Sequence, residues 1–144
     1  MWGPFARMSG AEVALELAGA IGRFEERAEN VISAARSDLV STTQFLEDRR
    51  RVWQEELARR QEALNICRLT VTEAGPPDCS GYVAARDEAQ AKVDTLFAIL
   101  RRVEDAGSAF EAGAGRFQSE LASTCPAARA ELNRLSGVVG WYEA

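Results

Sequence analysis

Apolar side chains recur at helical spacing along most of this 144-residue chain. One series has steps of three and four residues that average close to 3.6, the pitch of a straight α-helix. A second series alternates steps of four and three, which is a heptad repeat. The first series is Leu17, Ile21, Phe24, Ala28, Val31, Ala35, Leu39, Thr42, Leu46, Arg49, Trp53, Leu57, Arg60, Leu64, Cys67 and Val71. The second is Ala89, Val93, Leu96, Leu100, Val103, Gly107, Phe110, Ala114, Phe117 and Leu121. The pattern predicts two long helices that form a scaffold rather than a pocket.

Local polar side chains predict where the first helix begins and which part of it is weakest. Residues 1–8 are expected to be irregular, and a helix is expected over residues 9–72. Ser9 followed by Glu12 forms a capping box, and Met8 with Val13 fits a hydrophobic staple. Hydroxyl and carboxylate side chains in residues 37–43 compete for backbone hydrogen bonds, so a bend or break, if the helix has one, is predicted there.

Glycine and proline mark the remaining boundaries. Residues 73–79 are predicted to be a loop, because Gly75 suits the end of a helix and Pro76-Pro77 prevents its continuation. Asp78 or Ser80 is the expected cap of the next helix. The later segments are predicted as a helix over residues 80–123, a short helix over 126–136 and an aromatic tail over 137–144. Pro126 is expected either to kink the second helix or to open the short one.

Folding the chain about position 73 predicts which residues face each other. The expected pairs are Cys67 with Cys79, Leu64 with Tyr82, Trp53 with Val93, Leu46 with Leu100, Leu39 with Gly107, Phe24 with Ala122 and Phe5 with Trp141. The predicted fold is therefore all-α: a long antiparallel helical hairpin with a short C-terminal helical segment, coiled-coil-like or part of a helical bundle. A break near Ser41 would instead give a three- or four-helix bundle. The two helical repeats differ in pitch, and Ser41 to Thr43 and Gly107 to Gly115 are expected to absorb the difference.

A two-helix hairpin buries little apolar surface, so a further interface is expected. A surface of small side chains beside the second stripe suits close approach of another helix, although the glycines there also fit a locally frayed helix. The aromatic residues near the two termini are expected either to pack on each other or to dock a partner. The candidate interface residues are Trp2, Phe5, Trp53, Ala106, Ala109, Gly113, Trp141 and Tyr142.

The three cysteines allow one disulfide in this register. Cys67 and Cys79 are predicted to lie opposite each other, where a disulfide would close the loop between the helices. In a reducing compartment the same two residues would be small buried hydrophobic side chains. Cys125 would lie too far away to join either and is expected to be a packed free thiol.

Composition and motifs argue against several functional classes. The net charge of −5 disfavours a nucleic-acid-binding surface, since that needs a positive footprint. The absence of histidine removes the commonest general base and metal ligand, and the cysteines match no zinc spacing. The chain has no phosphate-binding loop or nucleophile elbow. We therefore expect no enzyme activity, no catalytic or metal site, no cofactor and no membrane span.

The predicted hairpin is similar in general shape to the small secreted helical hairpins of the WXG100 type. The Trp-x-Gly turn that those proteins carry between their helices is replaced here by Gly75-Pro76-Pro77. The resemblance implies export without a cleaved signal peptide, and it assigns no site residue in this chain.

These observations lead to one principal hypothesis and one alternative. The principal hypothesis is a non-enzymatic structural subunit or adaptor that acts by self-association or by binding a protein partner. The alternative is a small helical-hairpin substrate or effector module of a signal-independent bacterial secretion system. Because Glu12 and Glu16 interrupt the only apolar run near the N-terminus, no signal peptide is expected. The default location is then the cytoplasm, with signal-independent export as the alternative.

Overall fold

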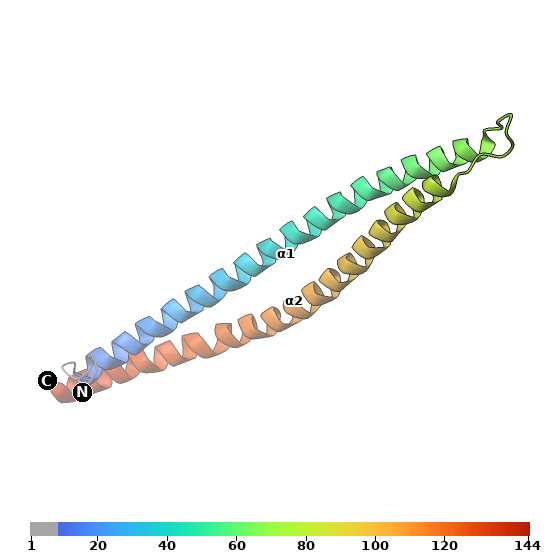
Figure 1. The fold of residues 1–144 in the computed structure, drawn as a ribbon. Coiled ribbons are helices and arrows are strands. Elements are labelled where there is room, and N and C mark those ends of the chain that lie inside the picture. The colour runs from blue at the N-terminus through green and yellow to red at the C-terminus, as the bar shows by residue number, and fades with distance from the viewer. Residues whose placement is uncertain (1–8) are drawn as a thin grey trace, which may run out of the picture. The chain divides into compact units, whose positions relative to one another are not determined.

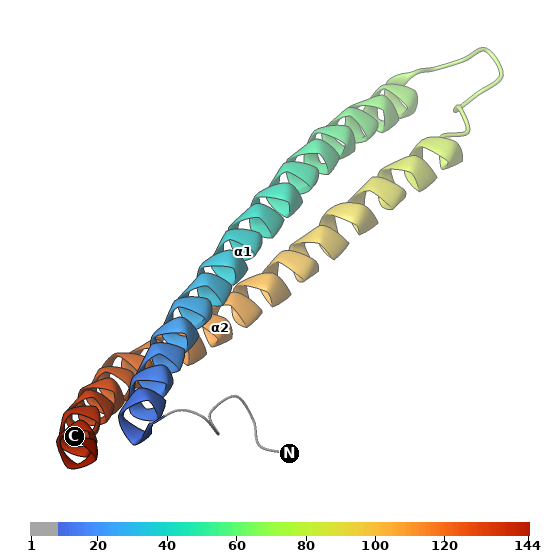
Figure 2. The same cartoon turned by 90° about the vertical axis from the view of Figure 1, so that its left-hand side faces the viewer.

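The chain forms an all-α helical hairpin (Figure 1). The structure, a computed structural model, describes residues 9–144. Helix α1 spans Gly10–Leu69 and helix α2 spans Ser80–Glu143, with residues 70–79 between them. The described residues fall into two compact units: unit 1 combines residues up to Arg36 with Ala109–Ala144, and unit 2 is Ser37–Ser108. Each unit is an antiparallel pair of segments, one from each helix (Figures 1 and 2).

The core of unit 1 consists mainly of small side chains. The start of α1 lies beside the end of α2 (Figure 2), and the buried apolar side chains there are Ala14, Ala18, Ile32, Ala114, Leu121 and Cys125. At the open end, the backbone N–H of Gly10 donates to Glu143 Oε1 at 2.9 Å, and Ser136 Oγ donates to the carbonyl of Ala11 at 3.1 Å. A Cβ at Gly10 would lie 2.9 Å from Val139 Cγ1, so only glycine fits there without displacing a neighbour.

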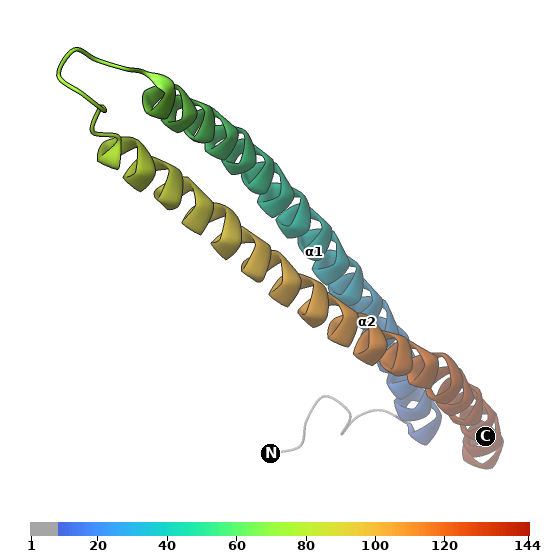
Figure 3. The ribbon, with the colours of Figure 1, turned by 90° about the vertical axis from the view of Figure 1, so that its right-hand side faces the viewer.

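Unit 2 includes the interhelical loop (Figure 3). It also contains the most deeply buried side chains of the described residues. Leu64 and Ala89 are fully buried, and Val93 and Leu100 are nearly so. Trp53 contacts Lys92, one residue from the predicted Val93. The register deduced from a hinge at position 73 therefore holds within this unit to about one residue.

Helix α1 begins as its capping residues predict. The backbone N–H of Ser9 donates to Glu12 Oε2 at 3.2 Å, and the backbone N–H of Glu12 donates to Ser9 Oγ at 3.2 Å. These reciprocal bonds satisfy two donors that the first turn of a helix leaves unpaired, which confirms the capping box. The staple partner Met8 lies outside the described residues.

Two predicted boundaries were wrong, one at the end of each helix. Helix α1 ends at Leu69 rather than residue 72. It is continuous through residues 37–43, as the long hairpin requires, and the alternative of a break near Ser41 is excluded. Helix α2 runs unbroken from Ser80 to Glu143, past Pro126 and through the expected aromatic tail. The Pro126 side chain is exposed and Cys125 beside it is buried. Water can therefore satisfy the carbonyl that lacks its helical donor, while packing of the adjacent side holds the helix.

The predicted apolar stripe of α1 was correct in part in unit 1. Ile21, Ala28 and Ala35 are half-buried as expected, but the alternate members of the stripe are displaced by one residue. Leu17, Phe24 and Val31 are 45%, 52% and 69% exposed, whereas Ala18 and Ile32 are buried. Small side chains allow the two helices to approach closely, so the larger ones lie at the edge of the contact. In α1 the buried and half-buried residues have two consecutive steps of four at 35–39–43, and in α2 at 110–114–118. Both departures overlap the stretches expected to absorb the difference in pitch.

The loop from residue 70 to 79 closes through local hydrogen bonds. Gly75 has φ of +108°, which glycine adopts readily, and its N–H donates to the carbonyl of Thr72 at 3.0 Å. Asp78 Oδ1 accepts a hydrogen bond from the backbone N–H of Ser80 at 3.0 Å, at the start of α2. The bonds from Ser80 lower the pKa of Asp78 below its ordinary value. Asp78 therefore caps α2, one of the two caps that the sequence allows.

Candidate interaction surface

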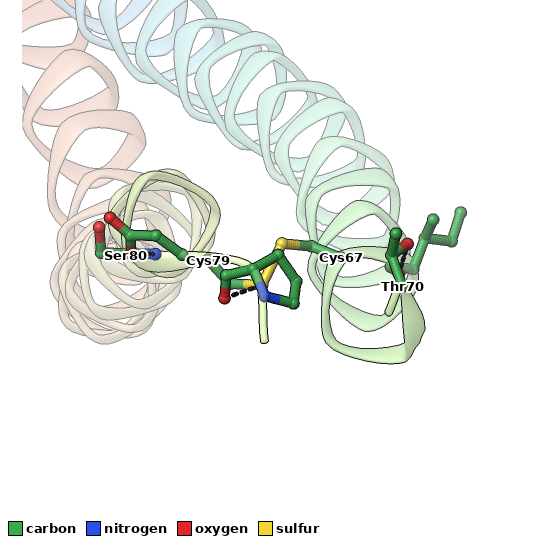
Figure 4. The surroundings of a disulfide bond; sticks show 7 residues. Cys67, Thr70, Cys79 and Ser80 are labelled. Carbon is green, nitrogen blue, oxygen red and sulfur yellow. Dashed lines mark hydrogen bonds between the residues drawn. A yellow bond between two sulfur atoms is a disulfide. The ribbon is translucent and has the colours of Figure 1, made fainter. Parts of the chain in front are cut away.

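A disulfide joins the two helices at the loop end of unit 2 (Figure 4). Cys67 lies in the last turns of α1, and Cys79 immediately precedes α2. Their Cα atoms are 6.0 Å apart, within the range that disulfides require. Among the described residues Cys125 is the free cysteine, and it is buried in unit 1. The structure thus brings together the two cysteines that the hairpin register pairs.

Two cationic side chains lie near the Trp53 ring in unit 2. Lys92 Nζ is 4.1 Å from the ring centroid of Trp53, and Arg60 Cζ is 5.6 Å from it. A cation over an indole face is attracted by the ring quadrupole. The ring is half-buried and borders a shallow groove of about 430 Å³ that is lined by Arg49, Trp53, Glu88, Ala91, Lys92, Thr95 and Leu96. These contacts make Trp53 part of the packing between α1 and α2.

Arg60 fixes the pairing of the helices from the edge of this cluster. Its guanidinium donates to the carbonyl of Ala85 at 2.7 Å and contacts Glu88 at 3.3 Å on α2, while also pairing with Glu56 at 2.9 Å on α1. The bond from Arg60 lowers the pKa of Glu56 below its ordinary value. Arg49, the other arginine in the predicted stripe, is exposed. Only one of the two arginines therefore bridges the helices.

The aromatic residues at the end of α2 are exposed. Trp141 and Tyr142 are 75% and 77% exposed, and their rings meet edge to face with centroids 4.9 Å apart. They border a groove of about 530 Å³ on α2, which also contains Arg134 and Val138. The other two predicted terminal residues, Trp2 and Phe5, lie outside the described residues.

The predicted small-residue surface is open in the described part of the chain. Ala106 in unit 2 and Ala109 in unit 1 are exposed, and Gly113 is half-buried. A Cβ built on Gly107, Gly113 or Gly115 meets no atom within 4 Å. Close approach of α1 therefore does not explain these glycines.

Alanine at these open glycines should stabilise the protein. Glycine inside a helix costs about 1 kcal/mol relative to alanine, so Gly113→Ala and Gly115→Ala should each raise the free energy of unfolding by up to that amount. Urea denaturation measures the change. Gly10→Ala is the control and should destabilise the protein, because the added Cβ would lie 2.9 Å from Val139. A loss of stability at Gly113 would contradict the open surroundings described here.

A polar network crosses between the helices in unit 1. Arg36 on α1 makes two hydrogen bonds to the Glu111 carboxylate on α2, at 2.8 and 3.1 Å, and a third to Gln118 at 3.1 Å. Gln118 in turn donates to Glu29 at 3.0 Å. The hydrogen bonds from Arg36 lower the pKa of Glu111 below its ordinary value. The network links the exposed polar sides of the two helices, and it encloses no buried binding site.

Acid should weaken unit 1 through Glu111. A carboxyl group whose pKa is lower in the folded than in the unfolded chain contributes stability above its unfolded pKa, and this is lost as the pH falls through its folded pKa. The melting temperature should fall between about pH 5 and pH 3. The melting temperature of the Glu111→Gln variant should fall less over that range. Calorimetry at several pH values measures the melting temperatures of both proteins. Equal declines would show that Glu111 contributes nothing to the acid sensitivity.

One row of candidate residues was misassigned from the sequence. Every seventh residue of α1 from position 17 to 66 forms what we call the outer row: Leu17, Phe24, Val31, Asp38, Phe45, Val52, Arg59 and Ile66. Its apolar members in unit 2, Phe45, Val52 and Ile66, are 64%, 50% and 59% exposed. The signal was present, since a strict seven-residue spacing marks a separate helical face. A 3.6-residue period applied to α1 places Leu17, Phe24 and Val31 of this row in the core stripe.

The described residues offer no inorganic site and no membrane span. Among residues 9–144, no group of three or more metal-ligating side chains is close enough to hold an ion. Within the same range, neither helix contains a segment both long and apolar enough to cross a bilayer.

Comparison with known proteins gives no relative for this chain. No protein-family model, no curated protein and no solved structure matches it. The surface of the hairpin itself is therefore the basis for a functional proposal.

Proposed function

We propose that this protein is a non-enzymatic structural subunit or adaptor that acts through association of its helical surface. The observation that carries the proposal is the exposure of the apolar side chains in the outer row of α1. In unit 1 these are Leu17, Phe24 and Val31, and in unit 2 they are Phe45, Val52 and Ile66, each between 45% and 69% exposed.

The regularity of this exposure supports an interface rather than scattered surface hydrophobicity. Single exposed apolar side chains are common and need no explanation. A row in which six of eight heptad positions are apolar is different, because another helix can cover these side chains by packing its own between them. Such coverage adds the apolar burial that each two-helix unit otherwise lacks.

Light scattering coupled to size exclusion tests this proposal, together with affinity purification from the native source. We expect either an oligomer or a specific complex that is lost when the outer row is made polar. Phe45→Glu with Val52→Glu is the test variant. Val40→Glu is the matched control, because Val40 is 66% exposed on α1 but lies outside the row. A folded monomer that binds no partner at cellular concentration would overturn the proposal.

A second candidate function has one specific observation in its favour. The disulfide between Cys67 and Cys79 supports an exported helical-hairpin module, since disulfides persist in oxidising compartments. Alkylation of protein from its native source, followed by mass spectrometry, distinguishes the two locations. A native pool with Cys67 and Cys79 oxidised supports export, and free thiols at both positions argue against it.

A further inference from the structure

We propose that the outer row of unit 2 binds the same row of a second copy of this chain in antiparallel orientation. Within unit 2 the row consists of Asp38, Phe45, Val52, Arg59 and Ile66, and the first four of these pair across the proposed contact. This inference rests on the proposed function, because it names the partner of a surface that the proposed function uses.

The face is accessible and lies away from the contact between α1 and α2. Phe45 and Val52 are 64% and 50% exposed. The Arg59 side chain is 74% exposed and forms an ion pair with Glu56 on its own helix, which leaves its other guanidinium N–H groups free for a second carboxylate. Leu46 and Trp53, the next residues along the helix, are half-buried on the side that faces α2. Consecutive helical residues point about 100° apart, so the outer row occupies a different side of α1.

The seven-residue spacing selects a helix as the partner. Side chains at this spacing follow a line that winds slowly around a straight helix. A second helix that supercoils with the first keeps contact along such a line, whereas a flat or globular surface loses it after a few turns. An identical helix from another copy meets this requirement without any further component.

The order of charges selects antiparallel orientation. From position 38 to 59 the row is acidic, aromatic, aliphatic and basic. In an antiparallel pair with its two-fold axis between Phe45 and Val52, Asp38 of each copy faces Arg59 of the other. The same register places Phe45 against Val52. A two-fold contact repeats each of these pairs, so one favourable ion pair becomes two.

A parallel pair in register would have the opposite electrostatics. It would place Asp38 against Asp38 and Arg59 against Arg59, and like charges in a helical contact are destabilising. In the antiparallel pair, the two Asp48 side chains lie near each other on one side of the contact, close to the two-fold axis. The two Arg49 side chains lie near each other on the other side. Asp48 is already paired with Arg51 at 3.5 Å on its own helix, which reduces that repulsion. The antiparallel pair therefore has the better balance of charges.

Charge reversal with rescue tests the pairing. Asp38→Arg should raise the dissociation constant of the dimer at least about tenfold at low salt, because two attractive pairs become repulsive. Arg59→Asp should do the same. The double variant D38R/R59D should restore the dissociation constant to within about threefold of the original, measured by sedimentation equilibrium. Val40→Ala, which removes an exposed apolar side chain outside the row, is the control and should leave association unchanged.

Cross-linking tests the orientation independently. In the antiparallel register Ser41 of one copy lies near Glu55 of the other, while the two copies of Ser41 are more than 20 Å apart along the helices, at 1.5 Å per residue. With Cys125→Ser as background, a mixture of S41C and E55C proteins should cross-link with a short bismaleimide. S41C protein alone should not. The circular dichroism of every variant establishes that it is folded.

The outcomes separate this inference from the proposed function. Rescue by the double variant together with the mixed cross-link supports antiparallel self-association. A protein that stays monomeric up to millimolar concentration overturns the inference, and so does a dimer that charge reversal leaves unchanged or that cross-links through S41C alone. In each of these cases, loss of a heterologous complex in the Phe45→Glu/Val52→Glu variant would still support an adaptor that uses the outer row for another protein.

Discussion

Replacing Cys67 and Cys79 by alanine should lower the free energy of unfolding by about 3 kcal/mol. The disulfide closes a loop between residues separated by 12 positions. Its removal increases the conformational entropy of the unfolded chain and so stabilises the unfolded state relative to the folded one. On the chain-entropy account, a loop of this size gives roughly that value at 25 °C. For a domain of this length, the corresponding drop in melting temperature is about 10 °C.

The structure also indicates that little else compensates for the lost bond. Most residues from Thr70 to Asp78 are exposed, and their hydrogen bonds are local. Without the disulfide, the last turns of α1 and the first turn of α2 should therefore open more readily. Hydrogen exchange at the amides of residues 66–69 and 80–83 should show the largest loss of protection, with the amides of unit 1 least affected.

Chemical reduction supplies the control for this prediction. Reductant should destabilise the wild-type protein by about the same amount as the double alanine variant, and it should leave the variant unchanged. Cys125→Ala addresses the remaining thiol, which forms no disulfide in the structure. If reductant left the wild-type melting curve unchanged, the pairing of Cys67 with Cys79 would contribute nothing to stability.

The sequence predicted the hairpin because its strongest signals are local or are fixed by geometry. Ser9 and Glu12 satisfy each other within one turn, so the start of α1 depends on no distant contact. Pro76-Pro77 prevents a continuous helix, and a short loop then determines the register of two antiparallel helices. The register is best defined beside the loop, because errors in it accumulate with distance from the turn. The facing of Cys67 and Cys79 could therefore be predicted.

The choice of buried face depends on the partner helix and could not be read from α1 alone. Leu17 and Phe24 are more hydrophobic than Ala14 or Ala18, so hydropathy favours burying them. The small side chains of α1 instead allow α2 to approach closely, and the larger ones remain at the edge. Only knowledge of both packed surfaces distinguishes these arrangements.

Pro126 was misjudged for a related reason. Proline removes a helical hydrogen bond and usually ends or bends a helix. Here its side chain is exposed while Leu121 and Cys125 are buried against α1. The packing of the buried side of α2 offsets the loss of one backbone hydrogen bond at Pro126. A prediction from proline alone does not include that packing.

Leu64→Ala should destabilise the protein by about 2–5 kcal/mol, comparable to loss of the disulfide. Among the described residues, Leu64 is the one large side chain with no exposed area. Removing its methyl-bearing carbons loses their transfer free energy and leaves a cavity between α1 and α2. Ala89, also fully buried, is too small and too firmly held on its helix to fill that space.

Urea denaturation of Leu64→Ala measures this effect, with Leu69→Ala as the matched control. Leu69 lies at the end of the same helix and is 81% exposed, so its truncation should change stability by less than about 0.5 kcal/mol. Leu64 also lies one turn from Cys67, and the two act on the same end of unit 2. Their combined removal should cost less than the sum of the single losses, because an end already opened by one change has less packing to lose through the other. Strict additivity would show instead that the disulfide and the core around Leu64 stabilise unit 2 independently.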